Sequence, residues 1–327
     1  MKDIVKILTV LIFIGYAGVA QDAIVGNDSN PFLADPTIFL SNGTYYLYGT
    51  TGDSKFGKDK GFLVYTSNDL KDWKSPIGAQ NGLALKKGDA FGDTGFWAPQ
   101  VFEYQNMFYM VYTANEHIAI ATSDSPLGPF KNATKTDLEA PVRQIDPFVF
   151  FDSDGKKYLY HVRLTEGNRI FVAELEDNLQ AIKLETLKEC LSAEEAWENI
   201  QNVEWPVSEG PTVLKHGDLY YMMYSANDFG NPDYAVGFAT SKSPLGPWKK
   251  ADESPIIHKS VLGINGTGHG DVFIDKRGEM QYVLHTHFND SQVAPRRSAI
   301  VKIDFKKNGN QPDLLKIEKE SFRFLKH

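Results

Sequence analysis

Three carboxylates stand in one recurrent setting, at the entry to a predicted β-strand. Asp35 and Asp146 each come directly before a proline and Glu209 comes before Gly-Pro, and an alternating strand pattern follows each of them. Inverting hydrolysis of a glycosidic bond needs two such groups, an ionised base that activates water and a protonated acid for the leaving oxygen. A third carboxylate near the acid would raise its pKa, because like charges disfavour ionisation. Three acids in one cleft could also bind a cation.

A repeated unit that offers an acid at its entry can gather residues so far apart in the chain on one axis. Two further openings match the first three, Trp97-Ala98-Pro99 and His269-Gly270-Asp271, so that successive openings lie 62, 49, 63 and 60 residues apart. Each opening leads into an alternating strand, a turn, a Tyr-rich strand and a later third strand. The repeat therefore predicts five copies of one antiparallel unit.

Each period is long enough for a four-stranded sheet, and a ring of such sheets is a β-propeller. We predict an all-β chain with a single five-bladed β-propeller domain over residues 21–327, whose inner strands bring the acids to one mouth. A large sandwich need not repeat a motif at this interval, and β-helix repeats are far shorter. One short helix is expected over 192–200, where Ser-Ala-Glu-Glu opens like a capping box.

Composition and charge exclude several classes of partner. The formal net charge of −8 does not favour binding to nucleic acid or to an anionic membrane surface, because both carry negative charge. Aromatic residues make up 13% of the chain, which suits stacking on neutral sugars as well as sheet cores. The single cysteine, Cys190, excludes intramolecular disulfides.

The N-terminus predicts export. Residues 1–20 combine basic residues, an apolar run over 7–14 and small residues at 17, 18 and 20, which is typical of a signal peptide. The apolar run is short for a transmembrane span. We therefore expect a periplasmic or secreted protein, with no membrane span after signal removal.

Five segments together resemble glycoside hydrolase family 43. They are Ala-Asp-Pro-Thr-Ile at 34–38, Phe-Trp-Ala-Pro at 96–99, Ile-Asp-Pro-Phe-Val-Phe at 145–150, Ser-Glu-Gly-Pro-Thr-Val at 208–213 and Gly-Thr-Gly-His-Gly-Asp-Val-Phe at 266–273. They follow the family's order and spacing over essentially the whole mature chain. The resemblance implies a five-bladed propeller and an inverting mechanism, with Asp35 as general base, Glu209 as general acid, and Asp146 tuning and orienting the acid.

The resemblance also bears on the cation and on an arginine. His269 matches a histidine that in many members binds a calcium or sodium ion on the axis, often through water; a hydrogen bond to a buried carboxylate is the alternative. Arg296 and Arg297 resemble the family's arginine near the end of the fifth blade, which contacts the substrate or an acid, and we favour Arg297. No organic cofactor is expected.

Aromatic side chains near the openings are candidates for the sugar-binding wall. Trp97 opens the second unit, Phe96 precedes it, and Trp205 comes four residues before Glu209. We expect all three to contact substrate, and core packing under the mouth is the alternative reading.

The favoured hypothesis is an exported inverting glycosidase that removes terminal α-L-arabinofuranosyl residues from arabinan, arabinoxylan or xylan. A β-D-xylosidase, an endo-arabinanase and an exo-galactanase are alternatives on the same fold. A non-catalytic carbohydrate-binding propeller would need the aromatic residues but not three acids. A retaining fructan-type enzyme would open on Trp, Asn and Asp before proline, whereas Phe32-Leu33-Ala34 precedes Asp35 here.

Overall fold

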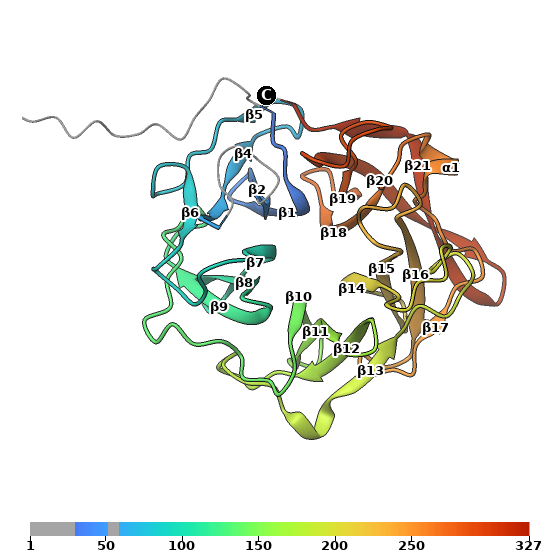
Figure 1. Ribbon diagram of the computed structural model, residues 1–327, viewed down its shortest axis with the longest axis horizontal. Coiled ribbons are helices and arrows are strands. Elements are labelled where there is room, and N and C mark those ends of the chain that lie inside the picture. Colours follow the sequence, from blue (N-terminus) through green and yellow to red (C-terminus); the bar gives the residue numbers. More distant parts are fainter. Residues whose placement is uncertain (1–29, 52–58, 327) are drawn as a thin grey trace, which may run out of the picture.

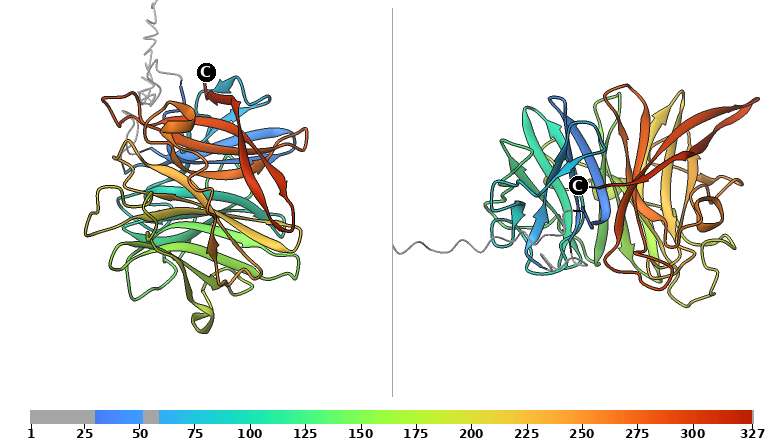
Figure 2. Two further views of the ribbon diagram at one scale, coloured as in Figure 1. Left: turned by 90° about the vertical axis from the view of Figure 1, so that its right-hand side faces the viewer. Right: turned by 90° about the horizontal axis from the view of Figure 1, so that it is seen from above.

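Five antiparallel sheets stand around a central axis. The computed structural model describes residues 30–51 and 59–326, so the predicted signal peptide lies outside the described residues. Figure 1 views the ring down its axis, and Figure 2 shows the same blades from two sides. The predicted five-bladed β-propeller is confirmed.

The strands follow one another from the axis outwards in each blade. The first blade comprises β1 (Ala34–Ser41), β2 (Thr44–Thr50), β4 (Tyr65–Ser67) and β5 (Trp73–Lys74), beside a small sheet of β3 (Gly61–Leu63) and β6 (Leu83–Lys86). The second comprises β7 (Trp97–Tyr104), β8 (Met107–Ala114) and β9 (His117–Ser123). The third comprises β10 (Gln144–Phe151), β11 (Lys157–Leu164), β12 (Asn168–Glu174) and β13 (Lys188–Leu191). The fourth comprises β14 (Ser208–His216), β15 (Leu219–Ala226), β16 (Ala235–Ser241) and β17 (Lys249–Lys250), and the fifth β18 (Gly268–Ile274), β19 (Met280–Thr286), β20 (Arg297–Asn308) and β21 (Gln311–Phe324).

Local turn chemistry explains the inner hairpins. The β1–β2 turn places Asn42 and Gly43 at φ values of 48° and 74°, and the β7–β8 turn places Gln105 and Asn106 at 50° and 61°. Two consecutive residues at positive φ match the twist of a two-residue hairpin, and Asn and Gly tolerate that conformation best. These turns fix the register that sends alternate side chains to the two faces of each blade.

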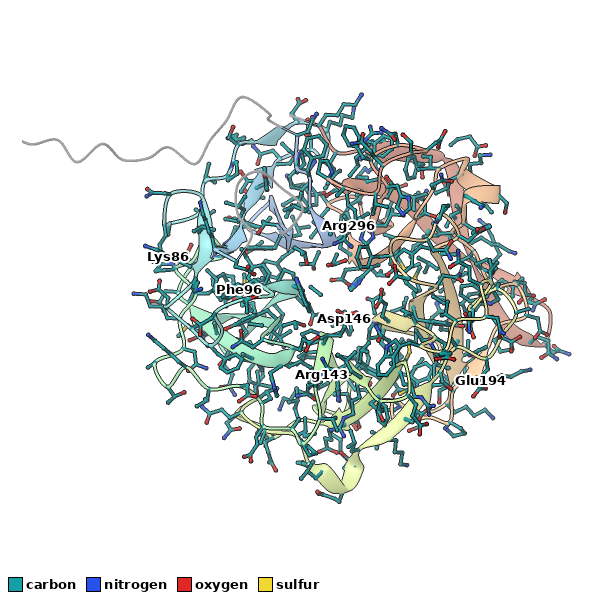
Figure 3. All side chains as sticks on the ribbon, viewed as in Figure 1. Lys86, Phe96, Arg143, Asp146, Glu194 and Arg296 are labelled. Atoms are coloured by element: carbon teal, nitrogen blue, oxygen red, sulfur yellow. The ribbon has the colours of Figure 1, made fainter. Side chains whose placement is uncertain are left out.

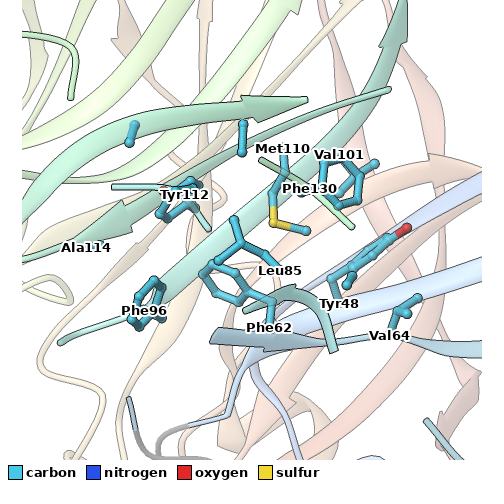
Figure 4. Packing of buried hydrophobic residues seen from close by; sticks show 14 residues of the cluster. Tyr48, Phe62, Val64, Leu85, Phe96, Val101, Met110, Tyr112, Ala114 and Phe130 are labelled. Atoms are coloured by element: carbon cyan, nitrogen blue, oxygen red, sulfur yellow. The ribbon is translucent and has the colours of Figure 1, made fainter. Parts of the chain in front are cut away.

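Aromatic residues fill the space between the blades. Figure 4 shows the cluster between the first two blades, where Phe62 meets Phe96 at 5.9 Å between ring centroids and Phe96 stacks on Tyr112 at 6.2 Å. Phe96 is 3% exposed. Burial of this interface holds the second blade in place as one wall of the axial site.

The last residues close the ring. The N–H of Trp73 in β5 donates to the carbonyl of Lys326 at 3.0 Å, and Asp72 and Lys326 form a β-bridge. Leu325 is buried in the core cluster of the first blade. The end of the fifth blade is therefore bonded to the outer edge of the first.

The helix predicted over 192–200 is wrong, because that segment forms turns. The buried carboxylate of Glu198 accepts hydrogen bonds from the N–H groups of Glu194 and Glu195, and also from Tyr224 and Lys250 of the fourth blade. This network ties the segment to the blade. Helix in the described residues is confined to α1 (Lys259–Leu262) and the 3-10 turn η1 (Leu184–Thr186), and neither is long enough to cross a membrane.

Candidate active site

A β-bulge interrupts the inner strand of every blade at the same place. The bulge residues all have positive φ: Asp35 at 47°, Ala98 at 43°, Asp146 at 54°, Gly210 at 58° and His269 at 37°. This conformation redirects the chain, and it brings the side chains of Asp35, Asp146 and His269 to the axis. Glu209 stands one residue before its bulge, so it is not structurally equivalent to Asp35 and Asp146.

Hydrogen bonds between neighbouring blades hold four of the bulges. The bulge N–H donates to a side chain on the second strand of the preceding blade: Ala98 to Thr50 Oγ1 (2.9 Å), Asp146 to Thr113 Oγ1 (3.0 Å), His269 to Ser225 Oγ (2.8 Å) and Asp35 to His285 Nδ1 (3.1 Å). These bonds satisfy backbone donors that would otherwise be buried without a partner.

The remaining bulge, at Gly210 in the fourth blade, explains where Asp146 lies. The corresponding acceptor position in the third blade is Val162, whose side chain cannot accept a hydrogen bond. The N–H of Gly210 donates instead to Asp146 Oδ2 at 3.1 Å. Asp146 is therefore bonded to the backbone directly after Glu209.

The carboxylate of Asp35 lies among the Thr50 hydroxyl, two imidazoles and the Arg296 guanidinium, which supplies the positive charge. Its Oδ2 accepts a hydrogen bond from Thr50 at 2.6 Å, and its Oδ1 lies 3.4 Å from Arg296 Nη1 and 3.3 Å from the Nδ1 atoms of His269 and His285. Burial alone would raise the pKa of Asp35, but the Arg296 guanidinium and the two histidines hold this pKa well below its ordinary value. Asp35 is therefore ionised and able to accept a proton.

Glu209 has the opposite character. Its Oε1 accepts a hydrogen bond from the Tyr234 hydroxyl at 2.8 Å, and its Oε2 accepts one from Asn168 Nδ2 at 2.9 Å. Burial and the negative charge of Asp35 raise the pKa of Glu209 to about 7, against these two hydrogen bonds, which lower it. Glu209 therefore carries a proton in acidic and near-neutral solution.

Asp146 shares this preference for the protonated form. Burial and the negative charges of Glu209 and Asp35 raise the pKa of Asp146 well above its ordinary value. Because Asp35 is already charged, ionisation of Asp146 would place a second negative charge beside it in a buried site, which is unfavourable. Environments that push the pKa values of carboxyl groups apart assign the roles of base and acid.

These groups line a cavity of about 520 Å³ at the mouth of the axis, within the usual size range of small-molecule sites. Of the residues predicted from the sequence, six line it: Asp35, Phe96, Trp97, Asp146, Glu209 and His269. Figure 3 shows Phe96, Asp146 and Arg296 around the axis, with Lys86 and Glu194 far from it. Phe96 is mostly core, whereas Trp97 is half-buried and presents part of its ring to the cavity.

The structure corrects the preference for Arg297. Arg296 lines the cavity and approaches Asp35, whereas the Arg297 guanidinium lies 3.3 Å from the ring centroid of Phe324. Adjacent side chains point to opposite sides at the start of strand β20, so only one of the two arginines can face the site.

Trp205 lies beside the site. It is 46% exposed, and its indole N–H donates to Asn168 Oδ1 at 2.9 Å. Asn168 lines the cavity, whereas Trp205 does not. Trp205 therefore reaches Glu209 only through Asn168.

Four residues of the site carried no signal in the sequence. Asn168, the first residue of β12, and Tyr234, directly before β16, lie 41 and 25 positions from the glutamate that they contact, and neither belongs to a motif of its own. Phe229 is 43% exposed, and the centroid of its ring lies 4.5 Å from the Arg296 guanidinium. The carbonyl of Phe229 lies 2.8 Å from His287 Nε2. Asp228 lines the cavity beside it.

The axial cation predicted at His269 stays a prediction. The described residues contain no group of three or more His, Cys, Asp or Glu side chains arranged to hold a metal ion, but a site that water completes does not need such a group. The imidazole Nδ1 of His269 faces the carboxylates of Asp35 and Asp146, and the cavity along the axis beneath them measures about 20 Å³. No step of the chemistry below is assigned to a metal.

The sequence matches a family model described as "Glycosyl hydrolases family 43" over residues 29–311. Two crystal structures are similar over 89% of this chain. An endo-1,4-beta-xylanase from Bacteroides thetaiotaomicron is 40% identical, with a TM-score of 0.80 over 95% of its own chain. A thermostable family-43 glycoside hydrolase is 36% identical, with a TM-score of 0.77 over 96% of its own chain.

Curated relatives are more distant. The beta-D-galactofuranosidase xynD of Aspergillus niger is 26% identical over 307 residues, which span 87% of this chain and 83% of that protein. The xylosidase/arabinosidase of Butyrivibrio fibrisolvens is 27% identical over 264 residues, which span 77% of this chain and 49% of that protein. The chain thus matches about half the length of the second relative.

Proposed function

Because the chain belongs to glycosyl hydrolases family 43 and is thus an inverting glycosidase, we propose that Asp35 is its general base and Glu209 its general acid. A water held by Asp35 gives up a proton to that carboxylate as its oxygen bonds to the anomeric carbon. The bond to the leaving oxygen breaks as Glu209 protonates it. Exchange with solvent then restores both carboxyl groups.

The observation that carries this proposal is that two carboxyl groups with opposed surroundings line one cavity, Asp35 beside the Arg296 guanidinium and Glu209 buried between Tyr234 and Asn168. Arg296 and two histidines favour the charged form of Asp35, and burial favours the neutral form of Glu209 up to about pH 7, where its pKa lies. An acid and a base thus coexist in the same pH range, as general acid–base catalysis requires.

Asp146 and Arg296 have supporting roles in this proposal. Asp146 accepts the N–H of Gly210 and so holds the backbone beside Glu209. The coupling between the two carboxyl groups is reciprocal, so whichever of them loses its proton first disfavours ionisation of the other. Arg296 keeps Asp35 ionised and lines the cavity beside it.

For the substrate we propose a terminal α-L-arabinofuranosyl residue of a plant cell-wall polysaccharide. The cavity of about 520 Å³ is large enough to hold a sugar residue. Relatives named xylosidase/arabinosidase and arabinoxylan arabinofuranohydrolase support a pentose substrate. A β-D-xylosyl residue is the second candidate, favoured by the relatives whose names include xylosidase.

The proposal includes export to the periplasm or the medium. It rests on the signal-peptide pattern of residues 1–20, and the relatives named extracellular endo-arabinanases support it. Fractionation of cells that express the full chain, with N-terminal sequencing of the exported form, tests it. An uncleaved protein in the cytoplasm would contradict it.

The first test uses 4-nitrophenyl α-L-arabinofuranoside and 4-nitrophenyl β-D-xylopyranoside side by side, with Asp35→Ala as control. Release from one substrate, absent in the variant, identifies the sugar and supports the base. Proton NMR of the first product formed gives its anomeric configuration, which must be inverted. Equal turnover by wild type and Asp35→Ala would reject the assignment of the base.

A further inference from the structure

The two oxygens of Glu209 are held by donors of different kinds. The Tyr234 hydroxyl at Oε1 can donate or accept, and its ring stacks on His285 at 5.6 Å between centroids. The carboxamide of Asn168 at Oε2 donates only if its nitrogen faces the glutamate. The orientation of this carboxamide therefore affects the equilibrium between the charged and the protonated form of Glu209.

Trp205 sets that direction. An indole N–H can only donate, so the Asn168 atom that it meets at 2.9 Å must be the oxygen. The nitrogen of the same carboxamide then faces Glu209 Oε2 at 2.9 Å. A chain of two hydrogen bonds thus runs from an exposed indole to a buried carboxyl group.

The backbone clamps the same residues together. The N–H of Asn168 donates to the carbonyl of Pro206 at 2.9 Å, and Asn168 and Val207 form a parallel β-bridge. Gly167, at φ 124°, lets the chains approach so closely that a Cβ there would lie 2.6 Å from the Pro206 carbonyl. The segment that carries Trp205 is thus fixed against the start of β12, where Asn168 lies.

The start of this segment is also anchored. Buried Glu198 bonds to Tyr224 and Lys250 of the fourth blade. Asn227 joins it to the next connection, accepting from the Ile200 N–H and donating to the Trp197 carbonyl. The insertion between the third and fourth blades therefore presents Trp205 on a braced support.

We propose that Trp205 and Asn168 are positioning residues for the acid, and that the indole N–H holds the Asn168 carboxamide with its nitrogen towards Glu209. The proposal rests on the proposed role of Glu209 for its catalytic meaning. The Trp205 ring, nearly half exposed at the rim, is also placed to contact the leaving-group side of a sugar chain. Contact there would act on the acid through Asn168.

Every other titratable group near Glu209 has to be considered in a test that follows its protonation. They are Asp35 of β1, Asp146 of β10, Asp228 and Tyr234 of the β15–β16 connection, His269 of β18 and Arg296 before β20. Trp205 is hydrogen-bonded to Asn168, and Asn168 to Glu209. Changes at the two positioning residues therefore reach this cluster through Glu209.

Three variants test the proposal by NMR titration of the Glu209 carboxyl carbon in protein labelled at the glutamate side-chain carboxyl, assigned by the signal lost in Glu209→Gln. Trp205→Phe keeps a ring but removes the donor, which frees the carboxamide to turn its oxygen towards Glu209. Asn168→Asp keeps the shape and replaces the donor by a carboxylate. Ile200→Ala, an exposed position of the same insertion, is the matched control.

The pKa of Glu209 should rise by about one pH unit in Trp205→Phe, because a hydrogen bond to the charged form is lost. It should rise at least as far in Asn168→Asp, and it should stay unchanged in Ile200→Ala. The alkaline limb of kcat/KM should move to higher pH by the same amounts. Thermal melting of each variant checks that the fold is intact.

An unmoved Glu209 titration in both folded variants would overturn the proposal. The NMR titration of Glu209 can be measured whether or not Glu209 is the catalytic acid, so it tests the positioning proposal by itself. If instead the assignment of Glu209 as acid were wrong, Glu209→Gln would retain full activity on natural substrates, while the pKa of Glu209 would still shift in Trp205→Phe. A loss of activity at all pH values with no shift would assign Trp205 a merely structural role.

Discussion

Replacing Arg296 by methionine should raise the pKa of the base. Opposite unit charges separated by the 3.4 Å between Arg296 Nη1 and Asp35 Oδ1 attract by about 5 kcal/mol at an effective dielectric constant of about 20. Water that enters the vacated space would recover part of this, so we take about half. That loss corresponds to a rise of about two pH units in the pKa of Asp35.

The sign of the effect on activity follows from the role of the group. Asp35 acts as base only when it is ionised, so a raised pKa moves the acidic limb of kcat/KM to higher pH by about two units. The alkaline limb belongs to Glu209, whose pKa of about 7 should change little, and the active pH range becomes narrower. The rate should fall by about tenfold midway between the old and new acidic limbs, and by on the order of 10²-fold below the old limb.

The assay is the pH profile of kcat/KM on the 4-nitrophenyl glycoside that the wild type hydrolyses, because its shape is independent of any loss of sugar binding. Arg297→Met is the matched control, since that neighbouring guanidinium packs on Phe324 outside the cavity. Its acidic limb should coincide with that of the wild type. A lowered Arg296→Met profile with an unmoved acidic limb would refute the electrostatic reasoning.

Four further outcomes are expected. Asp35→Ala should lose about 10²–10⁴-fold in kcat while calorimetry still detects binding of the sugar product, and retention of most turnover would exclude it as base. Glu209→Gln should slow natural oligosaccharides far more than activated aryl glycosides, because only the natural leaving groups need a proton; equal losses would assign it another role. Asp146→Asn removes a neighbouring group that can become negative, so the alkaline limb should move to lower pH, and a fixed limb would contradict its influence on Glu209. Dialysis against EDTA tests the cation predicted at His269: a bound cation would make the activity fall and added calcium restore it, and unchanged activity would leave His269 only its contacts with Asp35 and Asp146.

Much of the fold could be predicted from local patterns. Turns such as Asn42-Gly43, alternation along the strands and the repeated proline openings depend on neighbours in the chain, so they indicate five hairpin-based units without tertiary information. The helix expected over 192–200 failed because Glu198 bonds to a blade that lies distant in the sequence. Local propensity could not reveal that contact.

The candidate site divides in the same way. The sequence identified Asp35, Asp146 and Glu209 by residue type and spacing, but it could not determine that Glu209 precedes its bulge while the two aspartates occupy theirs. Tertiary structure alone decided which of two adjacent arginines faces the cavity, since that depends on where strand β20 begins. It also decided the contrast between an ionised Asp35 and a protonated Glu209, because burial and charges contributed by different blades set those pKa values.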